Sequence, residues 1–183
     1  MEKLRNRKWV FLFIFVSITA LVLGVHNVFL YKQIDELKKD AVQNLTTEYD
    51  EIYRLSKIID EYYIKNDFRE ANIYRLLVNR TTHNFSTLLS KDLKNLLTLA
   101  YDPLFADLSD EQDTLNKEEA SKLITEINSA VMLITKNIVN MKDDEKEKLL
   151  DQTSPEYIKV NTQIKNMYVK YIKLVDDYFI DNK

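Results

Sequence analysis

Cysteine is absent from this sequence of 183 residues, and glycine and proline are nearly so, with one Gly and two Pro. Without Cys the chain cannot form disulfides, and it has no thiolate to act as a nucleophile or a zinc ligand. Sheets and loop-rich folds need Gly and Pro at their turns, whereas long helices do not. These absences predict an all-α protein built from few, long helices.

Histidine is almost as scarce, which restricts the chemistry that the chain can carry. His26 and His83 are the only two. Neither has a second His or a Cys at metal-binding spacing, and neither has an activated Ser nearby. The single glycine, Gly24, lies in an apolar run, so a Gly-rich phosphate loop is excluded. The sequence therefore predicts no enzymatic activity and no cofactor.

Acidic residues offer no better site. Asp107, Ser109, Glu111 and Glu118 fall at positions 1, 3, 5 and 12 of a calcium loop, but Gln112 stands where the sharp turn needs Gly. A solvated connector is the better interpretation of this stretch. The carboxylate pairs at 143–144 and 176–177 lie among lysines, whereas general acid–base catalysis needs a desolvated carboxylate in a pocket. We expect neither a metal site nor a catalytic pair.

Charge is distributed unevenly along the chain. Residues 1–30 contain one acid, Glu2, against four bases and so carry +3, while the remainder has 22 bases against 28 acids and carries −6. An acidic domain without a basic patch is not expected to bind nucleic acid. The same charge disfavours peripheral binding to anionic lipid.

A long apolar run near the N-terminus predicts a transmembrane helix. We call Trp9 to Tyr31 the apolar segment; it contains no Asp, Glu, Lys or Arg. A hydrocarbon core of roughly 30 Å needs about 20 helical residues. The aromatic rings at the two ends suit the membrane interfaces. The lipid bilayer is thus the first expected partner.

The flanks of the apolar segment predict its orientation. Residues 1–8 form a basic N-terminus, whereas the lysines after residue 31 are balanced by acids. The positive-inside rule then places residues 1–8 in the cytoplasm and residues 32–183 outside it, in a single-pass cell-membrane protein. The alternative is a secreted protein with a cleaved signal peptide. Cleavage after Ala20 or Gly24 would put Ile18 or Val22 at the third position back and leave further apolar residues behind, so we favour the uncleaved anchor.

Periodicity divides residues 32–183 into four expected helices, at about 32–65, 68–101, 117–140 and 155–180. Apolar residues recur every three or four positions in each, as on one face of a helix. In the second helix this stripe includes Tyr74, Leu77, Leu93, Leu96 and Ala100. A continuous stripe joins the apolar segment to the first helix.

Punctuation between these segments supports their bounds. Asn116 with Glu119 has the spacing of a capping box, and Ser154 before Pro155 is typical of a helix start. The residue before Pro103 is expected to end the second helix, leaving residues 102–115 as a connector. Thr81 to Asn84 is the weak point of that helix, because these residues have poor helix propensity.

Four helices with short connections predict an antiparallel four-helix bundle, or an extended helical hairpin, after the transmembrane helix. In the up-down-up-down order, the C-terminus would lie at the end of the domain where the first helix enters. The layout is similar to the helical sensor modules of bacterial chemoreceptors, although those have a second span and a cytoplasmic signalling part.

With no chemical motif present, we expect a non-enzymatic protein-interaction or scaffold module, whose partner is another protein or a second copy. The alternative is a ligand-sensing or regulatory domain with a pocket between helices. Tyr62, Tyr63 and Phe68 surround the expected tip of the first hairpin. Because aromatic side chains are enriched at interfaces, this tip is the predicted contact site for a partner.

Overall fold

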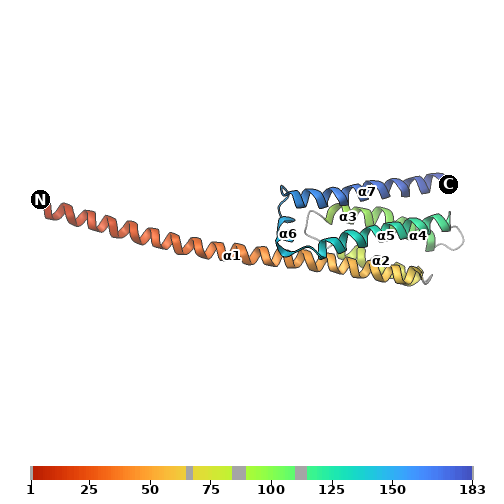
Figure 1. Ribbon diagram of the computed structural model, residues 1–183, viewed down its shortest axis with the longest axis horizontal. Helices are drawn as coiled ribbons and strands as arrows, with labels where there is room; N and C mark the ends of the chain where they lie inside the picture. Colours follow the sequence, from red (N-terminus) through yellow and green to blue (C-terminus); the bar gives the residue numbers. More distant parts are fainter. Residues whose placement is uncertain (1, 65–67, 84–89, 110–114, 183) are drawn as a thin grey trace. The chain divides into compact units, whose positions relative to one another are not determined.

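The protein is described from a computed structural model that covers residues 2–64, 68–83, 90–109 and 115–182. These residues form helices and short turns and contain no β-strand (Figure 1). The scarcity of Gly and Pro predicted this all-helical composition. The chain divides into two compact units, Met1–Ala41 and Val42–Lys183, which are described in turn.

The first unit is a single helical stretch that contains the apolar segment. It belongs to α1 (Glu2–Ile64), one helix that covers both the apolar segment and the residues after it. Every large apolar side chain described between Trp9 and Tyr31 is at least 40% exposed. The mean hydropathy over an 18-residue window of this helix reaches 2.2, and the helix is long and apolar enough to cross a membrane. In the apolar segment the Thr19 hydroxyl donates to the Phe15 carbonyl at 2.9 Å. The hydroxyl therefore has a hydrogen-bond partner without water.

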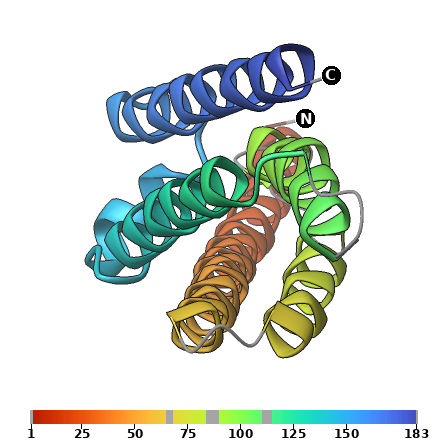
Figure 2. The same cartoon turned by 90° about the vertical axis from the view of Figure 1, so that its right-hand side faces the viewer.

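The second unit consists of the last turns of α1 and the helices that follow (Figure 2). These are α2 (Phe68–His83), α3 (Ser90–Leu96), the π-helical turn η1 (Leu97–Tyr101), α4 (Asp102–Ser109), α5 (Lys117–Val139), α6 (Asp143–Lys148) and α7 (Pro155–Asp181). Two of the starts match the predicted caps. The Asn116 side chain accepts the Glu119 N–H at 3.2 Å, and the Ser154 hydroxyl accepts the Tyr157 N–H at 3.0 Å.

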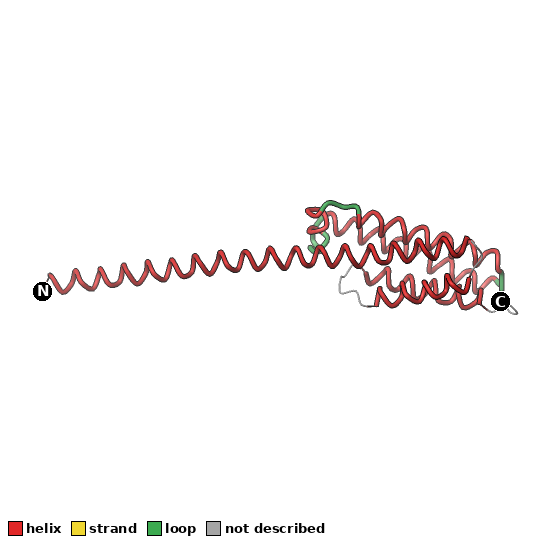
Figure 3. The backbone as a smooth tube through the Cα atoms, turned by 90° about the horizontal axis from the view of Figure 1, so that it is seen from below, coloured by secondary structure: helices red, strands yellow, loops and turns green. Residues whose placement is uncertain are grey.

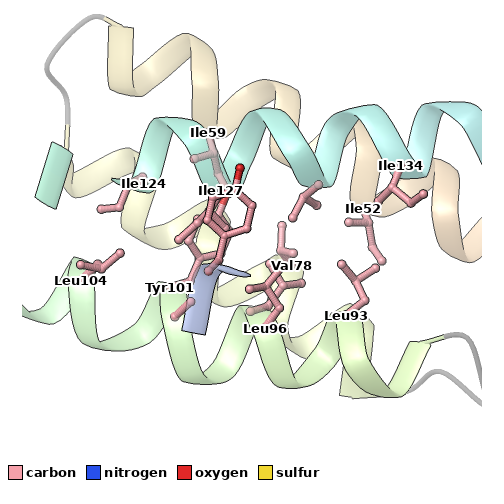
Figure 4. Packing of buried hydrophobic residues seen from close by; sticks show 14 of the residues in the cluster. Ile52, Ile59, Val78, Leu93, Leu96, Tyr101, Leu104, Ile124, Ile127 and Ile134 are labelled. Carbon is pink, nitrogen blue, oxygen red and sulfur yellow. The ribbon is translucent and has the colours of Figure 1, made fainter. Parts of the chain in front are cut away.

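One hydrophobic core joins these helices (Figure 4). Figure 4 shows Ile59, Tyr101 and Ile127 gathered at one level and Ile52, Leu93 and Ile134 at another. Each level therefore takes a side chain from α1, from α3 or η1, and from α5. The α1 stripe is buried from Leu45 onward, while the apolar side chains between residues 30 and 37 are exposed.

The face that α2 buries differs from the predicted stripe. Ala71 and Val78 are buried, whereas Leu77 is 40% exposed beside the exposed Ile73 and Leu76. The apolar residues of α2 form two adjoining faces, so spacing alone did not select the one that packs. The predicted positions 93, 96 and 100 are buried.

The sequence predicted that the helix ends before Pro103, and this prediction is wrong. The helix continues through Pro103 as α4. Pro lacks an N–H and its ring clashes with the carbonyl four residues back. Here the π-helical turn η1 directly precedes Asp102. A π-turn replaces the usual i→i−4 bonds with wider ones, so the backbone before Pro103 is already displaced from the regular ladder. The predicted connector at 102–115 is therefore helical up to Ser109.

α2 packs against α3 and α4, whereas the sequence predicted one helix up to residue 101. A straight helix would hold residues 75 and 102 about 40 Å apart, yet the Arg75 and Asp102 side chains form an ion pair. The chain thus folds back between α2 and α3. The predicted weak point falls at the end of α2, which ends at His83; Asn84 lies outside the described residues.

This reversal changes the end of the unit at which the chain terminates. Near the C-terminus, Tyr178 bonds to Asp107 at the end of α4, and α4 packs beside Arg75 and so near the start of α2. Tyr62, in the last turn of α1, stacks on Tyr74 at that same end. Figure 3 shows the end of α7 at the end of the unit where α1 terminates. The predicted position of the C-terminus, at the end where α1 enters, is therefore wrong.

Candidate functional site

Ionisable residues do not gather into a recognisable reaction centre in the described part of the chain. No group of three or more His, Cys, Asp or Glu side chains there could hold a metal ion. His26 is exposed on α1, and His83 ends α2. The carboxylates at 143–144 and 176–177 are exposed on α6 and α7.

The acidic stretch that resembles a calcium loop has a structural use at its first residue. The Asp107 carboxylate accepts the Tyr178 hydroxyl at 2.5 Å and the Leu115 N–H at 3.3 Å. The Tyr178 oxygen accepts the Asn116 N–H at 3.1 Å. Burial, and secondly the bond to Asp107, raise the pKa of Tyr178 to about 12. This cluster holds the end of α4, the start of α5 and the end of α7 together.

A second buried polar contact crosses the core. The Tyr101 hydroxyl donates to the Asn128 side-chain oxygen at 2.6 Å, and the Asn128 amide nitrogen donates to the Ser56 carbonyl at 3.0 Å. Burial, reinforced by the charge of Asp60, raises the pKa of the Tyr101 phenol well above its usual value. The contact fixes η1, α5 and α1 in register, and the neutral phenol is the form that suits it.

A third polar cluster attaches α2 to α4. The Asp102 carboxylate pairs with Arg75 and accepts the Asn79 amide at 2.6 Å. Arg75 also donates to Asn72 at 2.8 Å, and its guanidinium lies 5.5 Å from the centre of the Phe105 ring. Each of the three clusters connects side chains of different helices, so they act as joints between helices.

The predicted aromatic contact site is in part packed within the unit. The Tyr62 ring stacks on Tyr74, with centroids 5.4 Å apart and planes 18° apart. Tyr62 and Tyr63 are half-buried against the core. Phe68 begins α2, and its side chain lies outside the described residues. The role of these three residues in binding a partner stays a prediction.

A groove between α5 and α7 is a better candidate. Its volume is about 380 Å³. The lining comes from two helices: Ala130, Leu133, Ile134 and Asn137 of α5, and Gln163, Asn166, Met167, Lys170 and Tyr171 of α7. The small Ala130 side chain leaves room beside its larger neighbours. We call this site the α5/α7 groove.

Both apolar and polar groups face the α5/α7 groove. Leu133 is 63% exposed, although its neighbour Ile134 is buried in the core. Lys170 stands at the edge, with its amine 4.4 Å from the centre of the Tyr171 ring and 4.0 Å from the Glu126 carboxylate. The arrangement can seat an apolar group and bind an anion beside it.

Sequence reasoning missed this groove because residues 130, 134, 167 and 171 follow the three-or-four-residue apolar spacing that predicts a buried stripe in the third and fourth expected helices. Those stripes exist, but their edges remain uncovered. Leu133 was the residue that could have indicated an exposed apolar site. It is a large apolar side chain that lies off the apolar stripe of its helix, so the spacing does not predict its burial.

Comparisons with known proteins bring no relative to this site. No family model, no curated protein and no solved structure matches the chain.

Proposed function

We propose that this protein is a single-pass membrane protein that holds a non-enzymatic helical interaction domain outside the cytoplasm. One observation carries the proposal: α1 combines an exposed apolar segment with a stripe that enters the core of the second unit. Exposed apolar surface on this scale is unfavourable in water and favourable in lipid. The basic residues that precede the segment support a cytoplasmic N-terminus.

The membrane part is tested by charge insertion. Arg at the centre of a transmembrane helix costs about 2.5–3.5 kcal/mol on the insertion scale. We expect the double variant Ile14→Arg/Leu21→Arg to leave the carbonate-resistant membrane fraction. The matched control is Ile34→Arg/Leu37→Arg, which changes two exposed apolar residues of the same helix outside the predicted span. Retention of the first variant alongside the control would contradict a transmembrane anchor.

Orientation and cleavage need separate measurements. Protease added to intact cells stripped of their wall should digest residues 32–183, and protection of that region would refute the orientation. Mass spectrometry of the native protein should find the N-terminal residues. A mature N-terminus near Val25 would favour the secreted alternative.

The interaction role is tested on the full chain solubilised from membranes. We expect affinity purification to recover a reproducible protein partner, self-association included, and its absence would count against this role. The α5/α7 groove also favours the second candidate, a ligand-sensing domain, because about 380 Å³ is within the usual range for small-molecule sites. A thermal-shift screen with small molecules that shows no stabilisation would weaken that candidate.

A further inference from the structure

The α5/α7 groove has the dimensions and surface of a seat for a helix. Its α5 wall extends from Ala130 to Asn137, which is about 10 Å along the helix axis. That length matches two turns of a docked helix, whose apolar residues would lie at i, i+3 or i+4, and i+7. Leu133 and Met167 offer apolar surface to such a ridge, and the amides of Gln163 and Asn166 stand at its side.

The charge around this groove is opposite in sign to that of the domain. Lys170 is the one charged residue of the lining, and residues 127–142 and 157–175, which include the whole lining, contain no Asp or Glu. The chain from residue 31 onward carries −6. Glu126 precedes this stretch, with its carboxylate 4.0 Å from the Lys170 amine, and acids resume in sequence at Asp143. Lys170 is still more than half exposed on its side chain, at 57%.

We infer that the α5/α7 groove binds an amphipathic helix of a protein partner, with an apolar ridge seated between α5 and α7 and carboxylates on the flank that faces Lys170. This inference rests on the proposed interaction function and names the chemistry of the partner. Charge complementarity of this kind selects partners and accelerates their encounter more than it adds affinity.

A second copy of the chain is a poorer occupant. In the described part of the second unit, neighbouring exposed apolar side chains form a ridge on α2, at Ile73, Leu76 and Leu77. The exposed apolar residues of α7, Ile158, Val169 and Ile180, are eleven residues apart and form no such ridge. Two exposed arginines, Arg69 and Arg80, stand on α2, so its ridge would bring positive charge to Lys170. The sign of the flanking charge therefore points to an acidic partner.

The absence of Cys makes a site-specific assay possible. A single Cys replaces Gln163 at the groove or Lys165 on the opposite face of α7, and each variant of the full chain is labelled with an environment-sensitive fluorophore. The chain is held in phosphatidylglycerol nanodiscs, which repel acidic peptides. The probe is a synthetic peptide of about 18 residues with a Leu ridge and Glu flanks. Isolated helices shorter than about 12–15 residues are marginal in water, and this peptide is longer. A peptide with Lys in place of Glu is its counterpart.

We expect the Glu-flanked peptide to give a saturable change at the groove label and none at the Lys165 position. Salt should weaken the binding because the Lys170 edge is exposed. Lys170→Glu should weaken it by about tenfold. Lys165→Glu, which makes the same charge change on the other face, should leave it within about twofold. Circular dichroism is the control that both variants keep their helix content.

The inference is overturned if the Lys-flanked peptide binds as well, if both labels respond alike, if empty nanodiscs account for the peptide uptake, or if no peptide binds. Its failure is distinguishable from failure of the proposed function. If affinity purification recovers a partner whose binding Lys170→Glu and Leu133→Asp do not change, the interaction role stands and this groove is not its site. If no partner is recovered, the interaction role fails independently of the peptide result.

Discussion

The buried contact between Tyr101 and Asn128 allows a quantitative test of the core. Its two side chains come from η1 and α5, 27 residues apart in sequence, and meet at 2.6 Å. Both are almost fully buried, with Tyr101 at 0% and Asn128 at 2% exposure. Tyr101→Phe removes the donor while keeping the ring. Asn128→Leu removes the acceptor and keeps a side chain of similar size.

The two single variants should each destabilise the protein more than the loss of one hydrogen bond would suggest. A buried polar group left without its partner costs about 1–3 kcal/mol, whereas the net contribution of an intact bond is about 0.5–1.5 kcal/mol. Tyr101→Phe leaves the Asn128 oxygen without its donor, and Asn128→Leu leaves both the phenol and the Ser56 carbonyl without the side-chain contact. The double variant joins two apolar groups, so its cost should fall below the sum of the singles.

The assay is urea unfolding of the full chain in detergent, followed by far-UV circular dichroism. We expect each single variant to lose about 1–3 kcal/mol, with a coupling energy of about 0.5–3 kcal/mol between the sites. If the loss of stability in the double variant equals the sum of the two single losses to within about 0.3–0.5 kcal/mol, the two residues are independent. That result would refute the assignment of this contact as a joint between η1 and α5.

Three further predictions concern packing, capping and pH. Ile127→Ala, at a site with 0% exposure, should cost about 2–5 kcal/mol, whereas Leu133→Ala, in the groove, should stay within about 0.5 kcal/mol; urea unfolding compares them. Ser154→Ala removes the acceptor for the Tyr157 N–H and the donor to the Lys148 carbonyl, so we expect a loss of about 1 kcal/mol that Ser154→Thr partly restores in the same assay. Stability should decline as pH rises from about 10 towards about 12, because the raised pKa of Tyr178 keeps this phenol neutral in the folded state while unfolded tyrosine ionises near pH 10. The urea midpoint of Tyr178→Phe should decline less steeply over that window, and an equal decline would contradict the role given to Tyr178.

Several features could be predicted from the sequence because they depend on local chemistry. The scarcity of turn residues predicted an all-helical chain, and the uncharged run from Trp9 to Tyr31 predicted a helix able to cross a membrane. The caps at Asn116 and Ser154 depend on a side chain and a backbone N–H three residues away, so local spacing is sufficient to identify them. The stripes of α5 and α7 were found because each has one continuous apolar face.

The candidate site was not predictable in this way. A groove exists where two stripes meet without a third element to cover their edges, and sequence spacing does not say which edges are covered. Leu133 and Ile134 are adjacent in the chain, yet one is exposed and the other buried. Only the placement of α7 beside α5 brings Leu133 and Lys170 to the same opening.

Long-range contacts decided the rest. Asp102 looked like the end of a helix, but η1 carries the helix through Pro103, and the carboxylate of Asp102 is then placed to pair with Arg75. That pair brings α2 back against α4 and leaves Leu77 on the surface. The sequence by itself determined that the chain is helical and where its apolar helix lies, since both follow from residues close in the chain. The tertiary structure decided how α2 folds back, which face it buries and where the C-terminus lies, because those depend on partners far apart in sequence.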